Sequence, residues 1–487
     1  MLRSASIYYS TALSALLAEP ALGHSFGEPY KLPMPYWMYI YGAMAALVLS
    51  FVVLAYFYRA SDKRSKAKSI GIAHPTLLSM SRKLRLAFCL KALLLSLFLL
   101  SIVSGFIGNQ DSYRNFNMTF FWVTFALGAC YLTALFGDWY RYLNPWLTLA
   151  TACNRIYTNF TAGRFAYPQR LAYWPAILLY MGFICLELFG NTKPFSLSVA
   201  LCAYTALNLF AVWLVGSRAW FRYGELFSVM FRLIAMMAPF RLNHSEQGRS
   251  KLQLRWPFAG LIGQRIEHHS LLIFLLFMLS STAYDGLRET SLWFGIFWKD
   301  PSGIVEALAG KHPLYAYVEL RPWYIGFEIL CLLASPFIYL GLFRLFLWLG
   351  KALTRSELSV TELSLRFGYS LLPIALVYHI THYYTLLLSQ GLKVRGLISD
   401  PFGWGWDIFG TAISGRLPIL PDMGFVWDSQ VWLILIGHVA SVYLAHVEAL
   451  RSFTNSRQAS LSQLPMLMLM VIFTGVGLWI LAQPLQG

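Results

Sequence analysis

Four histidines lie in two apolar segments near the C-terminal end of the chain. His379 and His382 share one segment, and His438 and His446 share the next. Both segments are long enough to cross a bilayer, and ionisable side chains at that depth usually face other protein groups and take part in function. Neutral imidazoles bind transition metals, and histidines also relay protons. The pattern therefore predicts a buried imidazole site.

Helical geometry predicts which of these imidazoles meet. With a rise of about 1.5 Å per residue, His382 and His438 each lie about 12 Å below the predicted outer ends of their helices. His379 is one turn deeper on the face of His382, because residues three apart are neighbours on a helix. We therefore predict a metal site formed by His379, His382 and His438. His446 lies nearer the cytoplasmic side and is included among the candidate ligands.

The residue types suggest the chemistry of such a site. A three-histidine set suits zinc or copper and leaves a position open for water or substrate, and bound zinc makes that water a better nucleophile. Asp285 and Glu328 lie near the predicted outer ends of two further helices, so we regard both as candidate catalytic carboxylates. Haem b held by paired histidines is the alternative cofactor. A purely structural hydrogen-bond network is the other interpretation of the histidines.

The composition identifies the class of protein. The 487 residues are 57% hydrophobic and 12% charged, which is typical of a multi-pass membrane protein. The net charge of +16 comes from basic residues that gather in alternate loops. Their placement indicates topology, so the lipid bilayer is the expected partner and nucleic acid is not.

Apolar runs of about 20 residues predict the membrane-spanning helices, and we count ten. They cover residues 36–58, 84–108, 118–136, 171–190, 195–216, 270–287, 323–349, 367–390, 430–450 and 465–483. The predicted fold is an all-α polytopic bundle in a bacterial inner membrane, with both termini on the outer side by the positive-inside rule. Basic and bulky apolar residues alternate over 217–240, which predicts a helix in the headgroup plane.

The N-terminal residues have the features of a signal peptide. Arg3 precedes a modest apolar stretch, and Ala21-Leu22-Gly23 provides small residues for cleavage. Residues 1–23 are thus the predicted signal peptide, and residues 24–487 form one membrane domain. Cleavage would leave His24 as the first residue, with its amino and ring nitrogens available to a metal such as copper.

Short motifs are distributed over nearly the whole chain. They are Gly23–Gly27, Leu32–Pro35, Leu135–Trp139, Asn144–Trp146, Ala203–Ala206, Tyr284–Gly286, His379–Tyr383, Ser389–Gly391, Ser399–Asp407, Gly437–His446 and Pro465–Met466. Together they resemble the bacterial membrane proteins named after fenitrothion hydrolase. The resemblance implies hydrolysis of an aryl phosphotriester or phosphorothioate that reaches the site from the outer side. An activated water and a Lewis acid would suffice, because the leaving nitrophenolate is stabilised.

Two other functions remain open from the sequence. One is a copper- or haem-binding membrane protein for redox chemistry or metal handling. The other is a transporter whose intramembrane histidines relay protons. The sequence contains neither a Walker loop nor a G-x-S-x-G elbow, which argues against ATP-driven transport and against a serine esterase.

Overall fold

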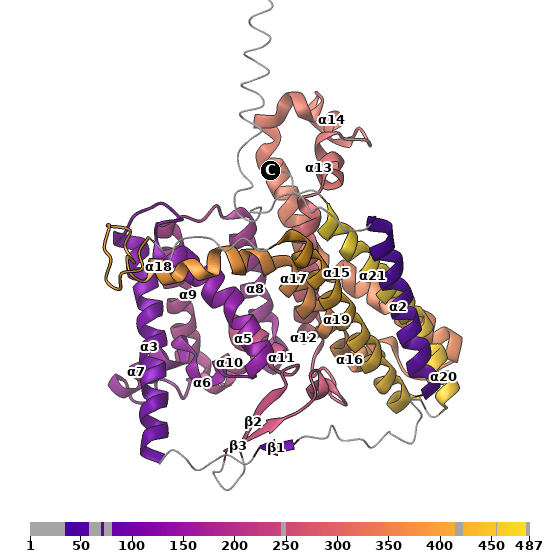
Figure 1. The fold of residues 1–487 in the computed structure, drawn as a ribbon, viewed down its shortest axis with the longest axis horizontal. Helices are drawn as coiled ribbons and strands as arrows, with labels where there is room; N and C mark the ends of the chain where they lie inside the picture. The colour runs from indigo at the N-terminus through magenta and orange to yellow at the C-terminus, as the bar shows by residue number, and fades with distance from the viewer. Residues whose placement is uncertain are drawn as a thin grey trace, which may run out of the picture.

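A computed structural model describes residues 35–57, 70–72, 80–244, 250–413, 422–453 and 455–483 as a bundle of long helices (Figure 1). Nine helical segments within these residues are long and apolar enough to span a membrane. The span predicted at 171–190 corresponds to a tenth apolar helix, which has only 16 residues. The all-α polytopic fold is therefore confirmed. His24 and the predicted signal peptide lie outside the described residues.

The helices fall into long and short segments. The long ones are α2 (Tyr36–Phe57), α3 (Met80–Ile107), α8 (Trp174–Phe189), α9 (Pro194–Val215), α12 (His269–Arg288), α15 (Tyr317–Thr354), α17 (Leu372–Gln390), α19 (Met423–Ser452), α21 (Leu464–Ala482) and a continuous segment made by α4 (Phe116–Met118), the π-helix η2 (Thr119–Leu127) and α5 (Gly128–Phe136). The short helices are α6 (Tyr140–Leu143), α7 (Pro145–Ile156), α10 (Ser217–Tyr223), α11 (Leu226–Ala235), α13 (Ser291–Trp298), α14 (Ile304–Ala309), α16 (Val360–Phe367), α18 (Val394–Leu397) and α20 (Ser456–Ser462). Single 3-10 turns are η3 (Gln169–Leu171), η4 (Ala259–Leu261), η5 (Pro313–Ala316), η6 (Gly368–Leu371) and η7 (Gly391–Lys393).

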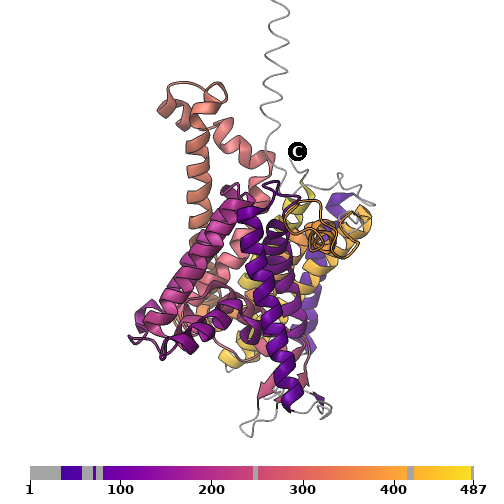
Figure 2. The same cartoon turned by 90° about the vertical axis from the view of Figure 1, so that its left-hand side faces the viewer.

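A small antiparallel sheet marks one end of the bundle. Its strands β1 (Ile70–Ile72), β3 (Ser250–Leu254) and β2 (Phe240–His244) lie in that order. In register, Leu254 of β3 is opposite Ile70 on one side and Phe240 on the other. Helices α13 and α14 project from the opposite end (Figures 1 and 2). We call these the sheet end and the α13 end; the positive-inside rule predicts that the sheet end is cytoplasmic.

Helix α12 lies at the centre of the bundle, and every residue from Ser270 to Asp285 is buried. It packs against α8, α15 and α17. His268 is its N-cap, and the ring Nδ1 of His268 accepts a hydrogen bond from the backbone N–H of Ser270.

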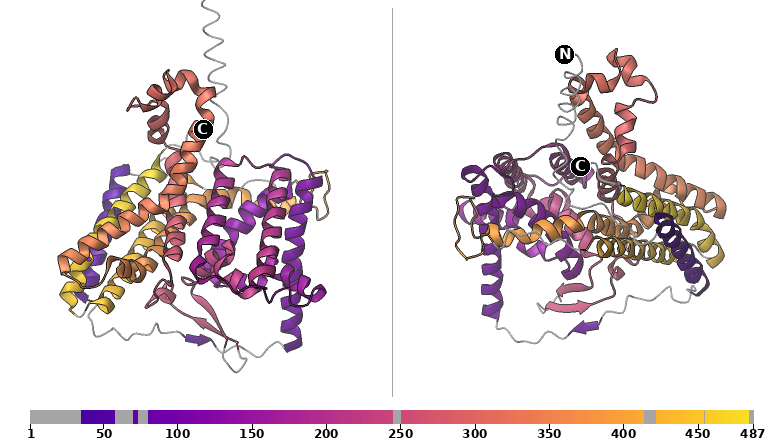
Figure 3. Two further views of the ribbon diagram at one scale, coloured as in Figure 1. Left: turned by 180° about the vertical axis from the view of Figure 1, so that it is seen from behind. Right: turned by 45° about the horizontal axis from the view of Figure 1, so that its top comes forward.

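Figure 3 shows the bundle from behind, with α3 and α9 on one side of α12 and α2 and α21 on the other. The side chains that α12 carries therefore face other helices.

Helix α15 is longer than a bilayer requires. Its 38 residues extend about 57 Å at 1.5 Å per residue, against about 30 Å for the hydrocarbon core. The excess lies at the α13 end, where α13 and α14 join it above the other helices (Figure 2). The indole of Trp298 packs against Tyr317 and Tyr324, with ring centroids 4.6 and 5.2 Å away. These contacts hold α13 on the projecting turns of α15.

Helix α11 departs from the prediction of a helix in the headgroup plane. Eight of its ten residues are buried, and the helix packs against α5 and α8. The carboxylate of its N-cap, Glu225, accepts hydrogen bonds from the backbone N–H groups of Phe227 and Ser228 and from the hydroxyl of Tyr204. The cap provides hydrogen-bond acceptors for the first N–H groups of α11 inside the protein. The helix is therefore buried among neighbouring helices and not in lipid.

Candidate functional site

A histidine–aspartate pair joins α17 to α12. The imidazole Nε2 of His382 lies 2.7 Å from Oδ2 of Asp285, whose side chain is 3% exposed. The next residue, Gly286, allows this close packing: a Cβ there would lie 2.5 Å from Cγ2 of Ile480 and 3.7 Å from the ring of His382. The sequence analysis selected both residues without pairing them. In the part of the chain that the structure describes, theirs is the one ion pair that involves a histidine.

Tyr383 extends this pair to a second carboxylate. Its hydroxyl lies 3.1 Å from Oε1 of Glu187 on α8 and 3.3 Å from Oδ2 of Asp285 on α12. A tyrosine hydroxyl carries one proton, so Tyr383 donates to one of these oxygens at a time. The four side chains of His382, Asp285, Tyr383 and Glu187 therefore form one hydrogen-bond network across three helices. We call this the acid–histidine network.

A small cavity adjoins the network. It has about 30 Å³ of space for the centres of water molecules, which corresponds to about two waters. Its walls come from η2, α5, α8, α11, α12 and α17, and its polar lining consists of Cys130, Tyr180, Glu187, Ser281, Thr282, Asp285, His379 and Tyr383. The π-helix η2 forms one wall, and such distortions are frequent at functional sites.

His379 lies on this cavity. Its ring centroid is 5.0 Å from that of Tyr383, and its Nε2 has no hydrogen-bond partner among the described residues. His379 and His382 are therefore brought to one site, as the spacing on α17 predicts. They lie with carboxylates and a tyrosine on helices α8, α12 and α17.

His438 and His446 lie elsewhere on α19. Nδ1 of His438 bonds the carbonyl oxygen of Ile434, and Ile434 packs against Ala43 of α2 and Leu478 of α21. His438 therefore shares the face of α19 that meets α2 and α21. Nδ1 of His446 lies 3.2 Å from Nε2 of Gln463, the residue between α20 and α21.

The predicted three-histidine set is not assembled. In the ranges that the structure describes, no three His, Cys, Asp or Glu side chains are grouped so that they could hold a metal ion. Equal depth places His382 and His438 at one level but does not fix the direction in which each points. Gly437 is the residue of α19 that packs on Val377 of α17, and His438 is turned about 100° from it.

Glu328, the other predicted catalytic carboxylate, lies outside the cavity lining. It is 6% exposed on α15, and its backbone oxygen accepts a hydrogen bond from the hydroxyl of Tyr284. Between it and the network lies Arg288, whose Nε is 3.2 Å from Oε1 of Glu289. Beyond the end of α12, burial raises the pKa of Glu289, and Arg288 opposes that shift. Glu328 thus belongs to an ionic cluster above the network.

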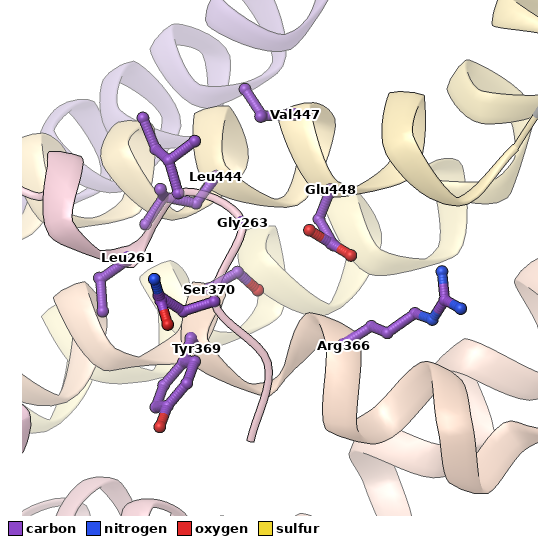
Figure 4. Close-up of a pocket in the computed structure, with 10 residues that line it drawn as sticks. Leu261, Gly263, Arg366, Tyr369, Ser370, Leu444, Val447 and Glu448 are labelled. Carbon is purple, nitrogen blue, oxygen red and sulfur yellow. The ribbon is translucent and has the colours of Figure 1, made fainter. Parts of the chain in front are cut away.

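A second, smaller cavity lies between the N-terminal end of α17 and the C-terminal part of α19 (Figure 4). It offers about 10 Å³ to water centres, about one water at most. Glu448 of α19 and Arg366 of α16 lie at its edge, and Arg366 bonds Glu362 at 2.7 Å and the hydroxyl of Ser452 at 3.3 Å. This cavity is polar but too small for an organic substrate.

Glu187 and Tyr383 are the members of the network that the sequence analysis did not select. Glu187 is the one charged residue in the apolar run 174–189, and this isolation was the available signal. Tyr383 directly follows His382 in the sequence. Its contacts with Glu187 and Asp285 become visible only when α8 and α12 are packed side by side.

Comparisons of the chain with protein-family models, with curated proteins and with solved structures give no match. The resemblance to fenitrothion hydrolases, with the metal and the substrate that it implies, therefore stays a prediction.

Proposed function

We propose that this protein is a membrane transporter in which the acid–histidine network binds protons and relays them across the bilayer. One observation carries the proposal: His382, Asp285, Tyr383 and Glu187 are linked by contacts of 2.7 to 3.3 Å inside a membrane-spanning bundle. The network is buried between helices near the ends of α8 and α12 that face the α13 end. Buried ionisable groups in membrane proteins are costly, and chains of Asp, Glu and His are typical of proton relays.

Each side chain has a distinct role in this proposal. His382 and Asp285 hold one proton between them, because a charge-assisted hydrogen bond stabilises the pair more than either charge alone. Tyr383 donates either to Asp285 or to Glu187, so rotation of one hydroxyl passes hydrogen bonding from one carboxylate to the other. Glu187 and His379 face the cavity, where waters connect them to the pathway.

The fold supports transport in a second way. The cavity is enclosed by the π-helix η2 and by the short buried helix α11, which supplies Met230. Interrupted and short helices around a polar site buried between helices are typical of secondary transporters. We therefore assign to these elements the movement that opens the cavity.

Hydrolysis of a phosphotriester is supported less well. Space for about two waters is far below the 300 Å³ or more of ordinary ligand pockets. The Nε2 atom of His382 is engaged by Asp285, and His438 lies on another face of the bundle. Zinc, copper or haem b would thus have to bind without the set that the sequence predicted.

Proton flux through purified protein in liposomes tests the proposal. A potential imposed across the membrane drives protons, and an enclosed pH-sensitive dye reports them. We expect flux through the wild type and its loss in Asp285→Asn and His382→Gln. Glu306→Gln, which changes an exposed carboxylate on α14, should retain the flux. Equal flux in all four proteins would refute the proposal, and cleavage of a nitrophenyl phosphotriester that depends on His382 would favour the hydrolase instead.

A further inference from the structure

We infer that the cavity beside the acid–histidine network binds a small protonated amine, such as ammonium or methylammonium, as the transported substrate. This inference rests on the proposed transport function and names its substrate class. It follows from the charge of the lining, from its aromatic rings and from its size.

The polar lining offers an excess of hydrogen-bond acceptors. Two carboxylates, Glu187 and Asp285, face the cavity, and neither Lys nor Arg is among its lining residues in the described part of the chain. Asp285 is paired with His382, so Glu187 supplies the negative charge that a cationic guest would meet. The unpartnered Nε2 of His379 adds a further site, and the buried Ser281 hydroxyl, which lies next to the hydroxyl of Tyr180, adds another oxygen. A guest with several N–H donors and a positive charge satisfies all of these groups.

The apolar lining also favours a cation. Trp122 and Phe183 lie with ring centroids 5.3 Å apart, and Tyr180 completes this aromatic wall. The faces of aromatic rings attract ammonium groups through the ring quadrupole, most strongly for tryptophan and in sites removed from water. An inorganic cation gains less from such a wall, because hard cations prefer a shell of oxygen ligands. The combination therefore selects an ammonium group.

The volume sets an upper limit on the guest. Space for about two waters accommodates ammonium, or methylammonium in place of both waters. A tetraethylammonium ion is much larger and would require the helices to separate. The cavity therefore predicts discrimination by size within one charge class.

Currents recorded from proteoliposomes on a solid support test the inference. Rapid jumps in ammonium or methylammonium concentration should produce saturable transient currents, and jumps in Na⁺, K⁺ or tetraethylammonium should not. Glu187→Gln should abolish the ammonium current, and Glu306→Gln should not change it. Trp122→Leu should raise the half-saturating concentration by roughly three- to thirtyfold, the effect of losing a desolvated cation–π contact. Trp432→Leu, on an exposed face of α19, is its matched control.

The outcomes separate this inference from the proposed function. Proton flux that depends on Asp285 without any ammonium current would overturn the inference and leave the proton relay standing. Absence of both signals would overturn both. Equal currents with Na⁺ or with tetraethylammonium would contradict the proposed substrate class. If Trp122→Leu does not fold, Phe183→Leu tests the same aromatic wall.

Discussion

Replacing Tyr383 by phenylalanine removes one oxygen atom from the centre of the network. The change deletes both hydrogen bonds from the hydroxyl, to Glu187 at 3.1 Å and to Asp285 at 3.3 Å. It leaves the ring in contact with His379 and His382, at centroid distances of 5.0 and 4.7 Å. The variant therefore separates proton relay from packing.

The two lost hydrogen bonds set the expected magnitudes. Leaving a buried acceptor without its donor costs about 1–3 kcal/mol, so the free energy of unfolding should fall by that amount. If the hydroxyl lowers the barrier to proton transfer by about 1.4 kcal/mol or more, its loss slows transfer at least about tenfold. Unfolding in a denaturing detergent and proton flux in liposomes measure the two effects separately.

Tyr131→Phe is the matched control for this change. The Tyr131 hydroxyl donates to the backbone oxygen of Ile380 on the same helix, α17, at 2.9 Å, and no carboxylate receives it. We expect a similar loss of stability with unchanged proton flux. A Tyr383→Phe protein with wild-type flux would refute the assignment of Tyr383 as the link between Asp285 and Glu187.

Three further predictions concern the surroundings of the network. Gly286→Ala should lower the free energy of unfolding by about 1–3 kcal/mol, because the new methyl group overlaps Ile480. In the control Gly326→Ala, the new methyl group has nothing within 4 Å, so this change should be neutral or slightly stabilising. Thermal unfolding of the two variants checks this. Glu225→Ala should lower the free energy of unfolding by about 1–3 kcal/mol, because it leaves the buried N–H groups at the start of α11 uncapped. Faster amide exchange confined to α11 would reveal the loss, whereas unchanged exchange would contradict the capping role. Burial raises the pKa of Glu289, so stability is lost as the pH rises from the pKa of this carboxyl in the unfolded chain through its pKa in the folded protein. Glu289→Gln should therefore gain stability relative to wild type at alkaline pH. An equal difference in stability at every pH would contradict this.

The membrane helices were predictable because their signal is local. A span needs about 20 apolar residues, and all ten predicted runs coincide with helices, including the 16-residue α8. The direction in which a side chain points is set by tertiary packing instead. For this reason His379 and His382 meet as their spacing predicts, whereas His438 faces α2 and α21.

Two other features depend on contacts between distant segments. The pairing of Asp285 with His382 spans 97 residues, and no local pattern indicates which carboxylate meets which imidazole. The alternating basic and apolar residues of this segment alone favour the membrane surface. The burial of α11 depends instead on contacts such as the hydrogen bond from the Tyr204 hydroxyl to the carboxylate of Glu225. The sequence identified Asp285, His379 and His382, whereas packing determined their partners and brought Glu187 and Tyr383 into the network.

Infrared difference spectroscopy during acidification tests the central claim most directly. A carboxyl group that takes up a proton gains a carbonyl stretching band, and isotope labelling of aspartate and glutamate separates the two kinds of side chain. The account predicts a carboxyl band in the wild type that is lost or shifted in both Asp285→Asn and Glu187→Gln and is unchanged in Glu306→Gln. A spectrum in which neither Asp285→Asn nor Glu187→Gln alters any carboxyl band would contradict proton binding by the network.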